Sequence, residues 1–108
     1  MEIIKTIDVA HPPRKPDEVE RLLDDALSQV QKSSSLRILK IIHGRTGNTK
    51  INTRNWAYTK RHRLEGIIYG EDYTIFGKLT QEMREEVGKF SDSDLEASNG
   101  GIIILWVK

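Results

Sequence analysis

The chain contains no cysteine, which excludes structural disulfides, thiolate zinc sites and a cysteine nucleophile. It has no apolar run approaching the ~20 residues that a bilayer span requires, and its first five residues lack the basic-then-apolar layout of a signal peptide. These absences predict a soluble, cytoplasmic protein with no membrane contact. With 31% charged and 37% apolar residues among 108, we expect a single folded domain spanning residues 1–108.

Acidic residues are also missing from a long internal stretch, between Asp25 and Glu65. The segments on either side of this stretch are both net negative, which the net charge of +1 conceals. A positive band between negative ends is typical of a surface that binds and orients phosphate, so nucleic acid is the first partner to consider. The band contains nine basic residues: Lys32, Arg37, Lys40, Arg45, Lys50, Arg54, Lys60, Arg61 and Arg63.

The periodicity of apolar residues predicts strands alternating with helices. The expected strands are residues 3–9, 36–42, 64–69 and 102–107, and the expected helices are 16–32, 53–63 and 80–90. Residues 73–76 either extend the third strand or return as a hairpin. The second and last strands are apolar on both faces, which indicates interior positions. This order predicts an α/β fold: a two-layer sandwich with a mixed, mostly parallel four-stranded sheet and two to three helices.

Polar residues follow the first two strands, where ligands meet an open α/β sheet. If these strands are parallel neighbours, the residues that converge are Asp8, His11, His43, Arg45 and Lys50. Gly44 and Gly47 would let the backbone approach a phosphate closely, and Arg45 could grip it with two hydrogen bonds. The helix at 53–63 would then present further cations along the nucleic-acid backbone: Arg54, Lys60, Arg61 and Arg63.

Each of these features also has a simpler structural interpretation. The two glycines can serve only the turn, Asp8 can accept a local turn hydrogen bond, and the histidines can fill a strand end or precede prolines. The cationic run can line a solvated face, and Trp56 can belong to the core and not to a base-stacking surface. The turn lacks the Gly-Lys-Ser/Thr ending of a Walker loop, which argues against nucleoside triphosphate hydrolysis.

Taken in order, five parts of the chain resemble the Smr (small MutS-related) domain. They are residues 7–9, the following helix with Leu22, Leu23 and Leu27, and residues 39–45, 54–56 and 99–107. The most specific is the Ile-Ile-His-Gly-Arg sequence that ends at Arg45. The resemblance covers roughly residues 3–69 and 99–108, and residues 72–98 look like an insertion relative to the compact form of the family. Two loops depart from the family pattern: His11 stands one place late after Asp8, and the glycine turn ending at Gly47 is one residue longer.

The resemblance implies an α/β sandwich like the C-terminal domain of a translation initiation factor. It also implies binding and nicking of DNA or cutting of RNA, in repair, recombination or ribosome-associated quality control. One hypothesis is therefore an endonuclease (a phosphodiesterase) with Asp8, His11 and His43 as catalytic residues. The alternative is a non-catalytic RNA- or ribosome-binding module, and a third reading is a domain that binds an acidic protein. The sequence does not indicate a divalent metal or an oligomeric state.

Overall fold

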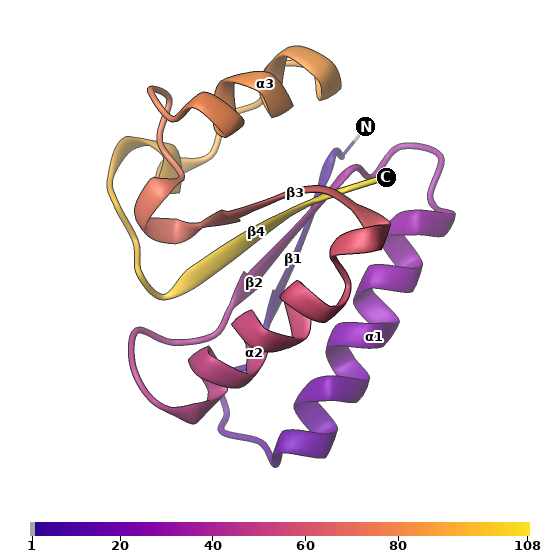
Figure 1. Ribbon diagram of the computed structural model, residues 1–108, viewed down its shortest axis with the longest axis vertical. Helices are drawn as coiled ribbons and strands as arrows, with labels where there is room; N and C mark the ends of the chain where they lie inside the picture. The colour runs from indigo at the N-terminus through magenta and orange to yellow at the C-terminus, as the bar shows by residue number, and fades with distance from the viewer. Residues whose placement is uncertain (1) are drawn as a thin grey trace.

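The computed structural model describes residues 2–108, which form a four-stranded sheet and three α-helices (Figure 1). The elements alternate along the chain in the predicted order. The strands are β1 (Ile4–Asp8), β2 (Ile38–Ile42), β3 (Leu64–Tyr69) and β4 (Ile102–Val107). The helices are α1 (Pro16–Lys32), α2 (Asn48–Thr59) and α3 (Lys78–Val87). No helix within residues 2–108 combines the length and the apolar character that a membrane span requires.

The sheet has the strand order β1-β2-β4-β3. β1 and β2 are parallel neighbours, with Asp8 opposite Ile42, whereas β4 is antiparallel to both β2 and β3. The prediction of a mixed sheet with interior β2 and β4 is therefore confirmed. The prediction of a mostly parallel sheet is wrong for the strand pairings, because β4 enters between β2 and β3 in the reverse direction. Strand direction cannot be read from apolar residues, which indicate only that a strand is interior.

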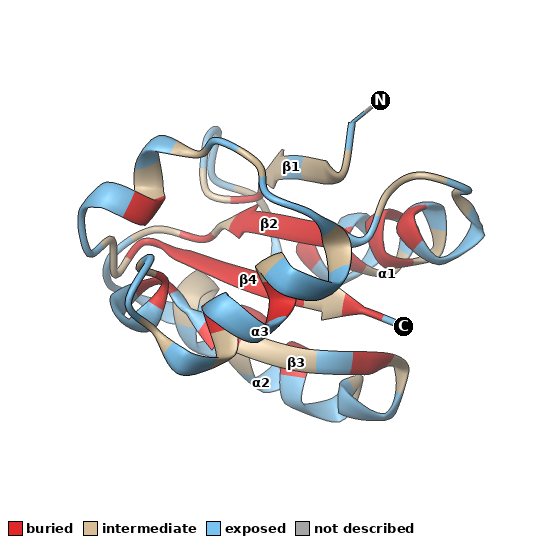
Figure 2. Ribbon diagram, turned by 90° about the horizontal axis from the view of Figure 1, so that it is seen from above, coloured by how far each residue is buried: buried red, intermediate tan, exposed pale blue. Residues whose placement is uncertain are grey.

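Helices cover both faces of the sheet, so the predicted two-layer arrangement describes only one side (Figure 1). Leu39, Ile41 and Leu105 belong to a core cluster with the apolar faces of α1 and α2. Ile38 and Ile104 point the opposite way and pack with Met83 of α3. The central strands β2 and β4 are buried almost throughout (Figure 2). Residues 72–98, expected as an insertion, supply this second cover.

The predicted boundaries hold for α1 but not for the other two helices. α1 begins at Pro16, where a proline is tolerated because its missing N–H would have no partner there. α2 begins directly after Gly47, five residues before the expected position, and ends at Thr59, four residues early. α3 begins two residues before and ends three residues before the expected positions. Residues 73–76 form neither a strand extension nor a hairpin, and Tyr73 is buried.

Candidate functional site

The loops that follow β1 and β2 lie side by side because the two strands are parallel. A surface groove of about 490 Å³ opens between these loops and residues 94–102. His11 contributes to it from the first loop, and Gly44 and Arg45 contribute from the second. The other polar residues that line it are Thr6, Lys40, Asp94 and Asn99. We call this the strand-end groove.

Asp8 and His11 form a hydrogen-bonded pair at the edge of the strand-end groove. One carboxylate oxygen of Asp8, Oδ1, accepts the backbone N–H groups of Ala10 at 2.8 Å and His11 at 2.9 Å, which folds the chain back on itself. The Nδ1 atom of His11 then lies 3.1 Å from Asp8 Oδ2. Because β1 ends at Asp8, the alternation of strand side chains no longer applies, and the one-residue displacement of His11 does not separate the pair.

The same contacts act on the charge of Asp8. Partial burial raises its pKa, but the Ala10 N–H, the His11 ring and the His11 N–H outweigh this effect, and the net pKa is lowered. The carboxylate therefore stays ionised near neutral pH and can hold the His11 ring by its Nδ1 atom. The His11 side chain is 73% exposed, which leaves its other ring nitrogen, Nε2, open to a ligand.

His43 does not join this pair. Its ring is buried, with Nδ1 2.7 Å from the Gly44 carbonyl oxygen and Nε2 accepting a hydrogen bond of 3.3 Å from Arg54 Nε. Burial lowers the pKa of His43, and the charges of Arg54 and Lys50 lower it further, so the ring is neutral. Asp8 lies opposite Ile42 in the sheet. Because side chains alternate along a strand, His43, which follows Ile42, points to the other face, toward α2. The structure thus places His43 beneath the glycine turn, where it supports the turn.

The glycine turn between β2 and α2 presents Arg45 to the strand-end groove. Gly44 and Gly47 have φ angles of +89° and +94°, a conformation that side chains disfavour. The Lys50 ammonium donates to the Arg45 carbonyl oxygen at 3.2 Å, which ties the turn to α2. The Arg45 side chain passes over Gly101, where a Cβ atom would lie 3.3 Å from Arg45 Cγ. Arg45 is exposed and has no ion pair within residues 2–108.

Arg54 and Lys50 belong to a second cluster, centred on Glu71. Both terminal nitrogens of Arg54 contact the Glu71 carboxylate, at 2.6 and 3.3 Å, and the guanidinium lies 4.4 Å from the centre of the Tyr69 ring. Lys50 Nζ is 3.9 Å from the same carboxylate. The bond to Arg54 lowers the pKa of Glu71 to about 2. Sequence reasoning missed Glu71, which lies outside the positive band.

The remaining cations of the predicted surface lie at the opposite end of the sheet. α2 runs back from the glycine turn over 12 residues, about 18 Å, before β3 begins. At that end Lys60 is 3.6 Å from Asp24, Arg61 stacks over Tyr58, and Arg63 donates to Gln31. The structure therefore places Lys60, Arg61 and Arg63 away from Arg45, and their binding to a nucleic-acid backbone stays a prediction. Trp56 is buried and donates to Asp24, which confirms that it belongs to the core.

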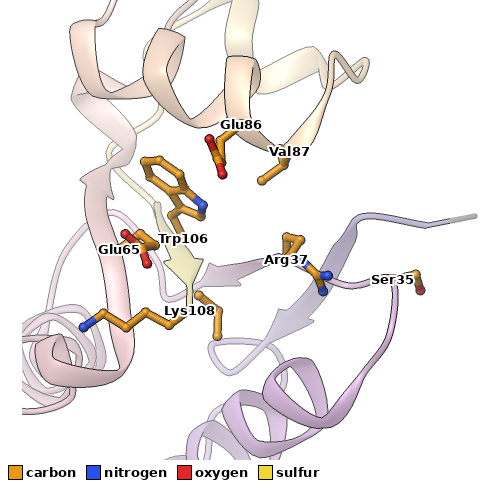
Figure 3. A pocket seen from close by; sticks show the side chains of 8 residues that line it. Ser35, Arg37, Glu65, Glu86, Val87, Trp106 and Lys108 are labelled. Carbon is orange, nitrogen blue, oxygen red and sulfur yellow. The ribbon is translucent and has the colours of Figure 1, made fainter.

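A second hollow, of about 630 Å³, lies at this far end (Figure 3). Trp106 stands between Glu65 and Glu86, with Arg37 on the other side. Side chains of both signs line it, so it does not concentrate positive charge as a phosphate site would. The strand-end groove is the better anion site, because Arg45 there is exposed and makes no ion pair within residues 2–108.

The fold and site define an α/β domain with an Asp–His pair and an arginine at the carboxyl edge of its parallel strands. Within residues 2–108, no group of three or more His, Asp or Glu side chains is arranged to hold a metal ion. No protein-family model matches the chain, and no curated protein or solved structure matches it either. The likeness to the Smr domain therefore stays a prediction from the quoted residues.

Proposed function

We propose that this chain is a nucleic-acid-binding domain that cleaves a phosphodiester bond in the strand-end groove. The observation that carries the proposal is the contact between Asp8 and the Nδ1 atom of His11, a residue that lines the same groove as Arg45. A carboxylate that orients a histidine ring supplies a positioned proton acceptor. A neighbouring guanidinium supplies charge for a phosphate. The same activity is the one that the resemblance to the Smr domain implies.

In this proposal His11 acts as the general base through Nε2. It takes the proton from the attacking hydroxyl, which is the 2′-hydroxyl of RNA or a water molecule on DNA. Arg45 and the N–H groups of the glycine turn stabilise the negative charge that develops on the phosphate oxygens. The leaving oxygen takes a proton from solvent. Asp8 is a positioning residue, because it holds Nδ1 and so directs Nε2 toward the substrate.

Cleavage of labelled single- and double-stranded RNA and DNA tests the proposal, in EDTA and with Mg²⁺ or Mn²⁺. Loss of a positioned base reduces the rate by roughly 10²–10⁴-fold, so His11→Ala should lose cleavage to that extent while keeping binding. Asp8→Asn should also lower the cleavage rate, because it removes the carboxylate that holds the His11 ring. Lys60→Ala is the matched control, because Lys60 pairs with Asp24 at the far end of the sheet. Equal cleavage by wild type and His11→Ala would refute the catalytic assignment.

The second candidate is a non-catalytic RNA- or ribosome-binding module. It is favoured by the position of His43, which is buried beneath the glycine turn, so that His11 is the one predicted catalytic residue among those described that lines the groove. Salt-sensitive binding without cleavage under any of these conditions would support the module. Absence of binding at low salt would reject both functions and leave an acidic protein as the partner.

A further inference from the structure

We infer that the seam between α1 and α2 binds unpaired nucleobases of the strand whose phosphate occupies the strand-end groove. This inference rests on the proposed function and names the part of the substrate that is read. Two adjoining hollows of about 240 and 310 Å³ run along the seam and share Pro16, Val19 and Asn52 (the helices are side by side in Figure 1). We call them together the amide groove.

The first reason is the composition of α2. Six of its twelve residues are asparagine or threonine, which are among the weaker helix formers. Three asparagines, Asn48, Asn52 and Asn55, recur at helical spacing and all line the amide groove. Their side chains are exposed and make no hydrogen bond within residues 2–108. Helix stability does not account for an amide stripe of this kind, whereas ligand recognition does.

The second reason is the chemistry of the groove. Val19, Leu23 and Trp56 are core residues whose outer edges form an apolar floor, and the indole is held in place by its hydrogen bond of 2.8 Å to Asp24. The carboxamides of Asn52 and Asn55 stand at the rim. A flat base can rest its face on such a floor while its edge pairs with an amide, which presents one acceptor and two donor hydrogens. A phosphate would find little charge here, since Arg14 is the one basic residue among those described that line it.

The third reason is that the near end of the amide groove lies beside the loops that bound the strand-end groove. Arg14 lines the near end of the amide groove and donates to the Asp8 carbonyl oxygen at 3.0 Å. Asn48 follows Gly47 of the glycine turn directly. From Asn48 to Asn55 the helix rises about 10 Å, which matches about three stacked nucleotides. The strand-end groove lies on the α3 side of the sheet and the amide groove on the α1 and α2 side, so a strand held at Arg45 passes over the glycine turn to lay its next bases along α2.

The test compares binding of single-stranded homopolymers of about ten nucleotides, as RNA and as DNA, by fluorescence anisotropy. Wild type should prefer one base over another by about tenfold or more, as amide–base pairs provide. Asn52→Ala combined with Asn55→Ala should abolish this preference. The salt dependence of binding should not change, because neutral amides release no counterions. Duplexes should bind equally to both proteins, because paired bases cannot enter.

Gln29→Ala is the matched control, since it removes an exposed amide from α1 outside the amide groove. Alanine favours helix, so the double variant should fold, and circular dichroism verifies this. Equal binding of all homopolymers by wild type, or a preference that survives the double substitution, would overturn the inference. If cleavage by the Asp8–His11 pair persists in that case, the inference of base binding fails and the proposed function holds. If wild type binds no strand at low salt, both fail.

Discussion

Replacing Lys40 with methionine removes the cation from a buried charged cluster beneath α3. Lys40 Nζ lies 2.9 Å from one oxygen of Asp92 and also contacts Asp94, and Tyr73 donates to Asp92 at 2.9 Å. Burial lowers the pKa of Lys40, but the bonds to Asp94 and Asp92 outweigh it and raise the net value. Methionine preserves the length of the side chain and leaves two carboxylates without their counter-ion.

The expected cost follows from the burial of the partners. The side chains of Lys40 and Asp92 are 11% and 9% exposed, and that of Asp94 is 25% exposed. Removing one partner of a buried pair costs about 3–5 kcal/mol, and the partial exposure of Asp94 favours the lower end, about 3 kcal/mol. For a domain of this size that corresponds to a fall in Tm of about 15 °C.

Urea unfolding followed by tryptophan fluorescence and circular dichroism measures this loss. Lys5→Met is the control, because Lys5 lies on the edge strand β1 and makes no ion pair within residues 2–108. Asp94→Asn should destabilise the wild-type protein. In the Lys40→Met background the same substitution should destabilise less, or even stabilise, so that the double-mutant cycle gives a coupling free energy of about 1 kcal/mol or more. A cost no greater than that of Lys5→Met, or additive effects of the two substitutions, would refute the reasoning.

The cluster also has a defined pH dependence. The bond to Lys40 is the main cause that lowers the pKa of Asp94 below its ordinary value of 3.8. The contribution of Asp94 to stability is therefore complete above that value and is lost as pH falls through the lower, folded-state pKa. The contribution of Lys40 is complete below 10.5 and is lost as pH rises through its raised folded-state pKa. Lys40→Met should therefore reduce the pH dependence of the free energy of unfolding in both the acidic and the alkaline range.

Four further outcomes follow from the structure. Because burial lowers the pKa of His43, the unfolded chain binds the proton more readily than the folded chain. The free energy of unfolding should therefore fall as pH drops below 6.5. His43→Phe should weaken this pH dependence in urea titrations. The Glu71 carboxyl should titrate by NMR with a pKa of about 2 and return toward 4.5 in Arg54→Met, while exposure limits the stability change to about 1 kcal/mol or less. Gly70→Ala should cost about 3 kcal/mol or more in urea unfolding, since its Cβ would lie 1.8 Å from the Asn99 carbonyl oxygen. Gly47→Ala should cost about 1–2 kcal/mol, because only its positive φ opposes a side chain.

Local patterns determined much of the fold. The apolar stripe from Val19 to Val30 predicted α1 with its correct ends, because helical periodicity and a proline in the first turn are properties of neighbouring residues. Continuous apolar runs also identified β2 and β4 as interior strands. The predicted start of α2 was five residues too late. Gly47 ends the turn with a positive φ, and the residue type alone does not show that a glycine adopts this conformation.

Both the sequence and the tertiary structure were needed to define the candidate site. The sequence alone brought Asp8, His11 and Arg45 to adjacent loops, given parallel strands, and the structure confirms that strand pairing. Tertiary structure alone decided which cations remain available, because ion pairs join residues far apart in the chain, such as Lys40 with Asp92 and Arg54 with Glu71. Charge counted along a sequence records which groups exist, whereas their pairing depends on distances of a few ångströms that only the folded chain defines.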